Sequence, residues 1–320
     1  MAQRVGAKSS YQEPIGTGGN REDLSEILYD VSPTDTPFLT LAKKGTAKGT
    51  NHEWLTDALS PPVANAVVEG NDATIVKAGS RVRLGNYTQI LEKSASVTGT
   101  QEKTDKAAVK SEMAYQVARR MKEIKRDLEA ALVGTTGGAK VAGSDTVARK
   151  AGNLKSYLTT DSWQGGATGV APTGNGLTAA TPGTARPFTE ALLTAALQKL
   201  WTNSGGSENI AALMGAVVRG KFSGLSSTAT RYVTTDDARL QSSIDVYDGD
   251  FHTVTAMPDR YSDPGALFLI DKDYVSIDDF RPIFSQDLAV TGDAQSKQII
   301  WETTLKVGNP LAHYCIDALS

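Results

Sequence analysis

Residues 102–133 read EKTDKAAVKSEMAYQVARRMKEIKRDLEAALV, a stretch without glycine or proline that is rich in strong helix formers. Its apolar residues recur at steps of four and three: Val109, Met113, Val117, Met121, Ile124, Leu128 and Leu132. This spacing places them in one stripe along a helix, and Gly134 supplies a C-terminal stop. The pattern predicts one continuous helix over 102–133, about 48 Å long. Its other faces carry mixed charges, which favour a solvated surface, or one with salt bridges between subunits, over DNA contact.

Residues 50–100, upstream of this helix, contain two strand-like segments separated by a long stretch without helical spacing. The segments are 52–55 and 82–97, and the residues between 61 and 80 are rich in Ala, Gly, Asn and Val. This order predicts a projecting two-stranded ribbon near 56–85. Isolated ribbons are marginally stable in water. We therefore expect the ribbon to lie on another surface, and no other part of this chain is obviously available.

The N-terminal region has too little apolar content in its first twenty residues to pack by itself. A short amphipathic helix is predicted over 21–31, where Leu24, Ile27, Leu28 and Val31 recur at helical spacing. Ser32-Pro33 ends that helix, because proline disfavours the helical state in the preceding residue. We expect an arm that gains order against a neighbour.

The region after the long helix begins with a glycine-rich stretch and continues as mixed helices and strands. Residues 134–187 hold eleven glycines, which predicts a loop-rich connection with short strands; a flexible linker is the alternative. The following pattern predicts an α+β unit and then a C-terminal strand pair. Its expected elements are helices at 188–201 and 216–225, strands at 209–214 and 266–270, a hairpin of 243–247 with 251–257, and the pair 299–307 and 311–316.

The composition of the 320-residue chain excludes several classes of protein. A formal charge of -3 lacks the basic excess of a tight nucleic-acid binder. The single cysteine, Cys315, rules out an internal disulfide framework and lies in an apolar run that predicts a buried thiol. The polar N-terminus lacks the apolar core of a secretory signal, and no stretch is long and apolar enough for a membrane span. We expect a chain made in a reducing cytoplasm.

No segment carries a convincing catalytic or metal-binding signature. Gly215–Lys221 has the glycine and lysine spacing of a phosphate-binding loop, but Phe222 stands where the magnesium-binding Ser or Thr is required. His52, His252 and His313 are scattered without metal-ligand spacing, and the paired aspartates fall where turns are expected. We predict no enzyme activity and no cofactor.

The order of arm, ribbon, long helix, α+β unit and returning strands resembles the Hong Kong 97 fold of tailed-phage major capsid proteins. Several stretches also resemble podophage-type major head proteins, and they span nearly the whole chain in the expected order. They are YDVSPTDTPF at 29–38, HEW at 52–54, AYQVA at 114–118, KRDLEAAL at 125–132, FTEALL at 188–193, RP at 281–282 and DLAVTGDA at 287–294.

The resemblance implies an α+β organisation with an N-arm, an E-loop, a spine helix in a peripheral domain, and an axial domain. The implied divisions are an arm at 1–48, the E-loop with its flanking strands at 49–100, and a peripheral domain at 101–187. The axial domain would then occupy 188–296, with C-terminal strands at 297–320 returning to the peripheral domain. The resemblance places inter-subunit contacts on the arm and the ribbon, and the candidates are Leu24, Ile27, Leu28, Trp54, Val67, Val68, Ile75, Val76 and Arg81.

The resemblance also implies a function. Copies would form hexamers and pentamers of an icosahedral head shell around double-stranded DNA, which they would contact non-specifically. Portal, scaffolding and cement proteins are the expected partners, with assembly in the host cytoplasm and a final place in the virion. An encapsulin-like compartment shell is the alternative, because it shares the fold but encloses cargo enzymes.

Overall fold

The long helix predicted from the sequence is the helix α3 (Glu112–Leu132) of the computed structural model, which describes residues 32–72, 75, 79, 81–105, 109–203, 209–225 and 245–320. The 21 residues of α3 span about 32 Å. Met113, Ile124, Leu128 and Leu132 are buried along its predicted stripe, which is confirmed from Met113 onward, whereas Val109 lies before the helix.

The prediction of one unbroken helix over 102–133 is wrong. A separate short helix, α2 (Gly99–Lys103), ends at Thr104, and α3 starts after Ser111, whose side chain accepts a hydrogen bond from the Ala114 amide. Short polar side chains of this kind compete for backbone groups and favour helix ends over helix interiors. The Glu102 carboxylate of α2 accepts from the Glu112 and Met113 amides (3.0 and 3.2 Å) and so caps the start of α3.

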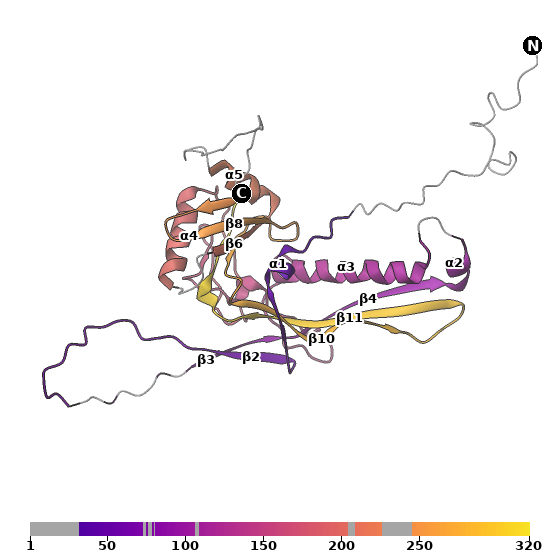
Figure 1. The fold of residues 1–320 in the computed structure, drawn as a ribbon, viewed down its shortest axis with the longest axis horizontal. Helices are drawn as coiled ribbons and strands as arrows, with labels where there is room; N and C mark the ends of the chain where they lie inside the picture. The colour runs from indigo at the N-terminus through magenta and orange to yellow at the C-terminus, as the bar shows by residue number, and fades with distance from the viewer. Residues whose placement is uncertain are drawn as a thin grey trace, which may run out of the picture.

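The α3 helix packs on a four-stranded sheet whose strand order is β1-β10-β11-β4 (Figure 1). The strands are β1 (Lys43–Thr46), β4 (Gln89–Thr98), β10 (Val275–Asp287) and β11 (Ala294–Val307). β1 runs parallel to β10, and the other two pairings are antiparallel. The short helix α1 (Pro37–Leu41) lies at one end of α3.

A six-stranded sheet forms the second half of the molecule, in the order β5-β12-β9-β6-β8-β7. Its strands are β5 (Trp163–Gln164), β6 (Asn209–Met214), β7 (Val246–Asp248), β8 (Thr253–Pro258), β9 (Leu267–Ile270) and β12 (His313–Ile316). Helices α4 (Glu190–Asn203) and α5 (Ala216–Gly224) bury their apolar faces in a cluster with this sheet. The predicted hairpin, strands and helices of this region are confirmed within a few residues.

The C-terminal strand pair is a further correction. β11 pairs with β10 and β4, whereas β12 lies in the other sheet between β5 and β9. The turn formed by η3 (Pro310–Ala312) carries the chain from one sheet to the other. β10 lies before the boundary at 296–297 that the resemblance implied, and β11 runs across it. Both strands nevertheless belong to the four-stranded sheet, so this sheet does not end at that boundary.

The glycine-rich segment 134–187 contributes to the core, so the flexible-linker alternative is wrong. Leu154 and Tyr157 of η1 (Leu154–Tyr157), with Leu158 and Trp163, are buried in the same cluster as α3. Glycine permits this close packing, because an added Cβ at Gly137 would lie 1.7 Å from the Ala131 carbonyl oxygen. The large cluster therefore joins α3, both sheets and this segment.

Candidate assembly interface

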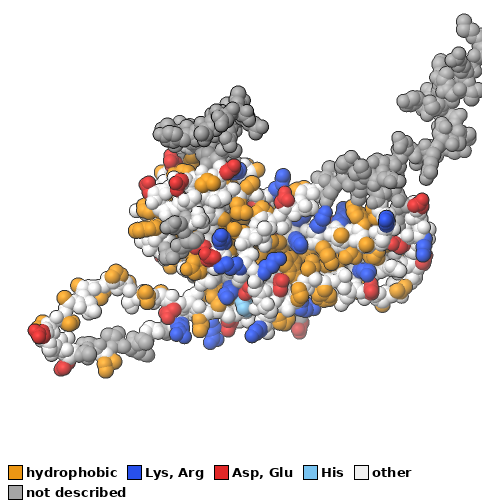
Figure 2. Space-filling model, viewed as in Figure 1, with side chains coloured by type: hydrophobic (Ala, Val, Ile, Leu, Met, Phe, Trp, Pro, Cys, Tyr) orange, Lys and Arg blue, Asp and Glu red, His pale blue; other side chains and the backbone are white. Residues whose placement is uncertain are grey.

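Five strongly exposed apolar side chains of the described chain lie on residues 57–81, here called the 57–81 loop. It leaves β2 (Asn51–Thr56), projects from the body and returns at β3 (Val82–Tyr87) (Figures 1 and 2). Its apolar residues are between 71% and 98% exposed: Leu59, Val63, Val67, Val68 and Ile75. The predicted interface residues Val67, Val68 and Ile75 are thus brought onto one projection that lacks support from its own subunit. Leu59 and Val63 extend the set and were not singled out from the sequence.

The ribbon predicted near 56–85 is two-stranded only at its root. β2 and β3 pair antiparallel from Asn51↔Tyr87 to Thr56↔Val82. The described residues of the 57–81 loop form no strand, and their local order is a turn in which the Asn71 amide donates to the Val68 carbonyl (3.1 Å). Backbone groups along this loop therefore lack ladder partners within the described part of the subunit.

Trp54, proposed as an inter-subunit contact, requires a correction. Its side chain is 8% exposed and belongs to the subunit's own core, with its ring centroid 6.0 Å from that of Tyr157. Trp54 lies in the paired part of β2, where alternate side chains face the body. Its apolar area is already buried, so it anchors the root of the loop and leaves little surface for a neighbour.

A buried polar network fixes this root to the body. The Asn86 side chain donates to the carbonyls of Leu305 (2.8 Å) and Gly152 (3.3 Å) and accepts from the Gly152 amide (2.8 Å). The Tyr157 hydroxyl donates to the Gly85 carbonyl (3.0 Å), which the Lys140 ammonium also reaches. Satisfied buried polar groups of this kind hold one geometry, because leaving any of them unpaired is costly.

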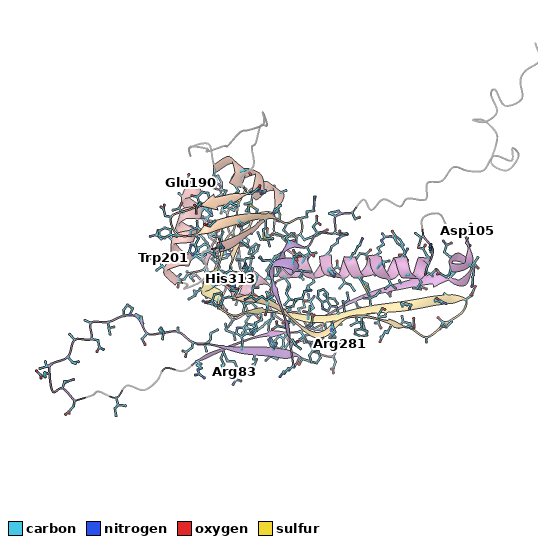
Figure 3. All side chains as sticks on the ribbon, viewed as in Figure 1. Arg83, Asp105, Glu190, Trp201, Arg281 and His313 are labelled. Atoms are coloured by element: carbon cyan, nitrogen blue, oxygen red, sulfur yellow. The ribbon has the colours of Figure 1, made fainter. Side chains whose placement is uncertain are left out.

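Glu302 of β11 is the charged centre of a second hydrogen-bonded cluster, which includes Thr88, two residues after Asn86. Its carboxylate accepts from Thr88 (2.8 Å) and Arg281 (2.7 Å) and pairs with Arg149. Burial acts to raise the pKa of Glu302, but the hydrogen bonds from Thr88 and Arg281 and the arginine charges outweigh it, so the pKa is lowered. Figure 3 shows Arg281 on the four-stranded sheet and Arg83 at the loop root. The root is rigid and charged, whereas the loop beyond it is apolar and exposed.

The charges beside the root are exposed and weakly held. Arg81, another predicted contact, lies 3.7 Å from the Asp57 carboxylate, and Arg83 lies 3.5 Å from that of Glu53. Exposed pairs of this type contribute little to stability. Their side chains are therefore available for partners outside the subunit.

The remaining predicted contacts, Leu24, Ile27, Leu28 and Val76, lie outside the described residues. The described chain starts beside the C-terminal part of α3. There Glu129 accepts from the amides of Phe38 (2.6 Å) and Leu39 (2.9 Å), and the Tyr261 hydroxyl donates to the Pro33 carbonyl (2.7 Å). Glu129 was missed from the sequence, because it looks like one more charge on a charged helix.

Arg119, Arg120 and Arg126 of α3 have partners within the subunit. Glu123 pairs with Arg119 (3.4 Å) and Arg120 (2.6 Å), Asp127 pairs with Lys93 (2.8 Å), and Arg126 lies over the Tyr261 ring. Figure 2 shows acidic and basic side chains interspersed along this helix. These ion pairs lie within the subunit, so salt bridges between subunits on this face stay a prediction.

The segment that resembles a phosphate-binding loop is helical. Residues 216–224 form α5, and Phe222 is buried in the core. Among the described residues, no group of three or more His, Cys, Asp or Glu side chains is placed to hold a metal ion. Cys315 is buried as predicted, and burial raises the pKa of its thiol. No described helix is long and apolar enough to cross a membrane.

Solved capsid structures share this architecture over most of their length. The cyanophage A-1(L) capsid subunit matches with a TM-score of 0.64 and 15% identity, covering 94% of this chain and 97% of that one. The capsid of a native GTA particle matches with a TM-score of 0.62 and 12% identity over 100% of both chains. The structure from Mycobacterium phage Bobi matches with a TM-score of 0.61 and 10% identity, covering 94% of this chain and 96% of that one. The chain therefore has the Hong Kong 97 type of phage capsid fold, in which the 57–81 loop is the E-loop and α3 the spine helix.

The family follows from the sequence match. The model of the family described as SU10 major capsid protein matches residues 8–320, and the chain belongs to that family. The major capsid protein of Escherichia phage Phieco32 is 37% identical over 116 residues. That match covers 36% of this chain and spans about a third of the relative's length, 33%.

Proposed function

We propose that copies of this chain assemble into hexamers and pentamers that form an icosahedral head shell around double-stranded DNA. Membership of a major capsid protein family supports a structural role. The observation that carries the proposal is the E-loop, whose apolar side chains are 71% or more exposed while its root is held by a buried polar network. A projection built this way requires an external surface, and a second copy of the chain supplies one at every lattice position.

The E-loop of one subunit would lie across the body of the next. Val67, Val68 and Ile75 would be buried there, with Arg81 at the polar rim of the contact. Obligate interfaces commonly bury about 2,000–5,000 Å² in total, more than a single loop provides. The N-terminal arm would therefore add contact area of its own in the shell.

The two sheets suggest the orientation of the subunit in a capsomer. We assign the four-stranded sheet with α3 to the peripheral domain and the six-stranded sheet with α4 and α5 to the axial domain. Because one apolar core joins the two sheets, the subunit would behave as a single rigid body in the shell. Curvature of the shell would then arise at contacts between subunits.

The expected partners are portal, scaffolding and cement proteins, with assembly in the host cytoplasm and a final place in the virion. Contact with DNA would be loose, because the formal charge is -3 and Arg119 and Arg120 of α3 are paired with Glu123. We assign no enzyme activity to the chain. Particles that hold cargo enzymes would favour the encapsulin-like alternative. Particles with DNA and a portal vertex would favour a phage head shell.

Negative-stain microscopy of the purified chain, alone and with its genomic neighbours, tests the proposal. We expect closed shells or capsomers. A variant with Val67, Val68 and Ile75 changed to Ser should give a folded subunit that does not assemble. A parent chain that stays a well-behaved monomer under all these conditions would overturn the proposal.

A further inference from the structure

A shallow apolar groove lies beside α3 on the four-stranded sheet. α3 packs on β4 and β11 and makes few contacts with β10, so part of the sheet is left uncovered on the side of α1. The groove has a volume of about 360 Å³. Its apolar walls are the partly exposed Leu39 of α1 and Ile283 of β10, and the buried Ile277 and Trp301 form its floor. Sheets in domains of this kind bury such strips under a second element.

The rim of this groove is basic. Lys44 of β1 and Lys125 of α3 line it, and both side chains are exposed. Neither forms a salt bridge with a residue that the structure describes, in contrast to Lys93, whose ammonium group lies 2.8 Å from Asp127. The one acid of the lining, Asp279, accepts a hydrogen bond from the Trp301 indole (2.7 Å). The groove thus favours an apolar and acidic occupant.

One segment of this chain has that chemistry. Residues 21–31 read REDLSEILYDV, with four acids against one arginine and with the apolar residues Leu24, Ile27, Leu28 and Val31 at helical spacing. Helices with such a stripe are stabilised mainly by packing it against a partner. The segment lies outside the described residues.

The connection to the groove is short. The backbone is held at Pro33 by Tyr261 and at Phe38 and Leu39 by Glu129, and Thr36 itself lines the groove. The chain between Val31 and Thr36 reaches at most about 18 Å. A tether this short gives the segment a high effective concentration at its own groove, in the millimolar range.

We propose that in the free subunit the segment 21–31 docks as an amphipathic helix in the groove of its own chain. Its apolar stripe covers Leu39 and Ile283, the partly exposed apolar residues of the lining, and its acids face Lys44 and Lys125. The docked helix completes the layer that α3 begins. It also withholds the arm from neighbouring subunits until it leaves the groove, which is a step beyond the shell assembly proposed above.

Disulfide trapping in the full-length, unassembled chain tests this proposal without requiring a shell. The native Cys315 is buried, so its thiol should not take part in disulfide formation. Leu24→Cys, Ile27→Cys and Leu28→Cys are each combined with Ile283→Cys and oxidised mildly, and the control is Tyr29→Cys, on the opposite face of the predicted helix. We expect intrachain disulfides to form about tenfold faster for the three apolar positions than for the control. Reversing the groove charges with Lys44→Glu and Lys125→Glu should remove most of that excess.

Two results would overturn the proposal. One is equal trapping at all four arm positions. The other is a disulfide that forms between chains when the single variants Leu28→Cys and Ile283→Cys are mixed, while the double variant forms no disulfide within one chain. If Ile283→Cys lowers the unfolding midpoint, Leu39→Cys on the other wall of the groove replaces it, with the same expectations.

Discussion

Glu129 illustrates how one residue connects the arm to the spine helix. Its carboxylate is fully buried. Burial, and then the charge of Asp259, raise the pKa of Glu129 to about 8, although the hydrogen bonds from the Phe38 and Leu39 amides favour the charged form. The folded chain therefore holds a proton that the unfolded chain releases above about pH 4.5. It follows that this residue's contribution to stability is full below pH 4.5 and is lost as the pH rises toward 8.

The variant Glu129→Gln, which mimics the protonated acid, should remove this pH dependence. Relative to the parent, its free energy of unfolding should rise steadily between pH 5 and pH 8, as measured by urea denaturation of the unassembled chain. Glu129→Ala leaves the Phe38 and Leu39 amides without an acceptor and should cost about 1–3 kcal/mol at pH 5. A Gln variant whose stability relative to the parent falls over this range would show that the amides dominate.

Glu302 should show the opposite dependence. Its pKa is lowered by Thr88 and Arg281, so its contribution is present above about pH 4.5 and is lost as the pH falls below that value. Glu302→Gln should destabilise the subunit by about 1–3 kcal/mol at pH 7, with a deficit that shrinks in acid. A deficit that stays constant down to pH 3 in the same denaturation experiment would contradict the lowered pKa.

At the scale of the elements, the apolar stripe of α3 could be predicted from the sequence but its start could not. Spacing identified Ile124, Leu128 and Leu132, because burial on one face imposes helical periodicity. The break at Thr104 depends on capping by Ser111 and by Glu102, and a run of helix formers hides such local hydrogen bonds. The core role of residues 154–163 was also missed, because the glycines around it suggested a loop, whereas they permit close packing.

The buried stripe predicts the cost of a cavity in α3. Leu128 is 1% exposed, so Leu128→Ala should lower the free energy of unfolding by about 2–5 kcal/mol. Arg119→Ala, on the exposed face of the same helix, should cost less than about 1 kcal/mol. If the two variants lose equal free energy of unfolding in thermal or urea denaturation, the apolar stripe does not contribute more to stability than the exposed face.

The E-loop makes a different prediction, because its apolar residues touch so little of their own subunit. Changing Val67, Val68 and Ile75 to Ser should leave the unfolding midpoint of the free chain unchanged and abolish assembly. Glu69→Ser, an exposed polar change on the same loop, is the matched control and should assemble. A lowered midpoint together with normal assembly would place these side chains in the subunit's own fold.

At the scale of the whole molecule, the strand order was the least predictable feature. The sequence pattern located β11 and β12 but missed β10, and it could not assign β11 and β12 to different sheets, since pairing over long separations leaves no local signal. Of the proposed contacts, Val67, Val68, Ile75 and Arg81 lie exposed on the E-loop, whereas Trp54 lies in the core. Hydrophobicity alone could not separate an anchor from a projecting contact, because both are apolar residues in the same segment.

We infer that the E-loop of this subunit becomes packed only in a shell, against the body of a neighbouring copy. A near-atomic electron cryomicroscopy map of assembled particles tests it most directly. We expect Val67, Val68 and Ile75 to be buried against the body of an adjacent subunit while the root at Asn86 and Glu302 keeps its present hydrogen bonds. A shell in which the E-loop stays exposed to solvent, with subunits joined elsewhere, would contradict it.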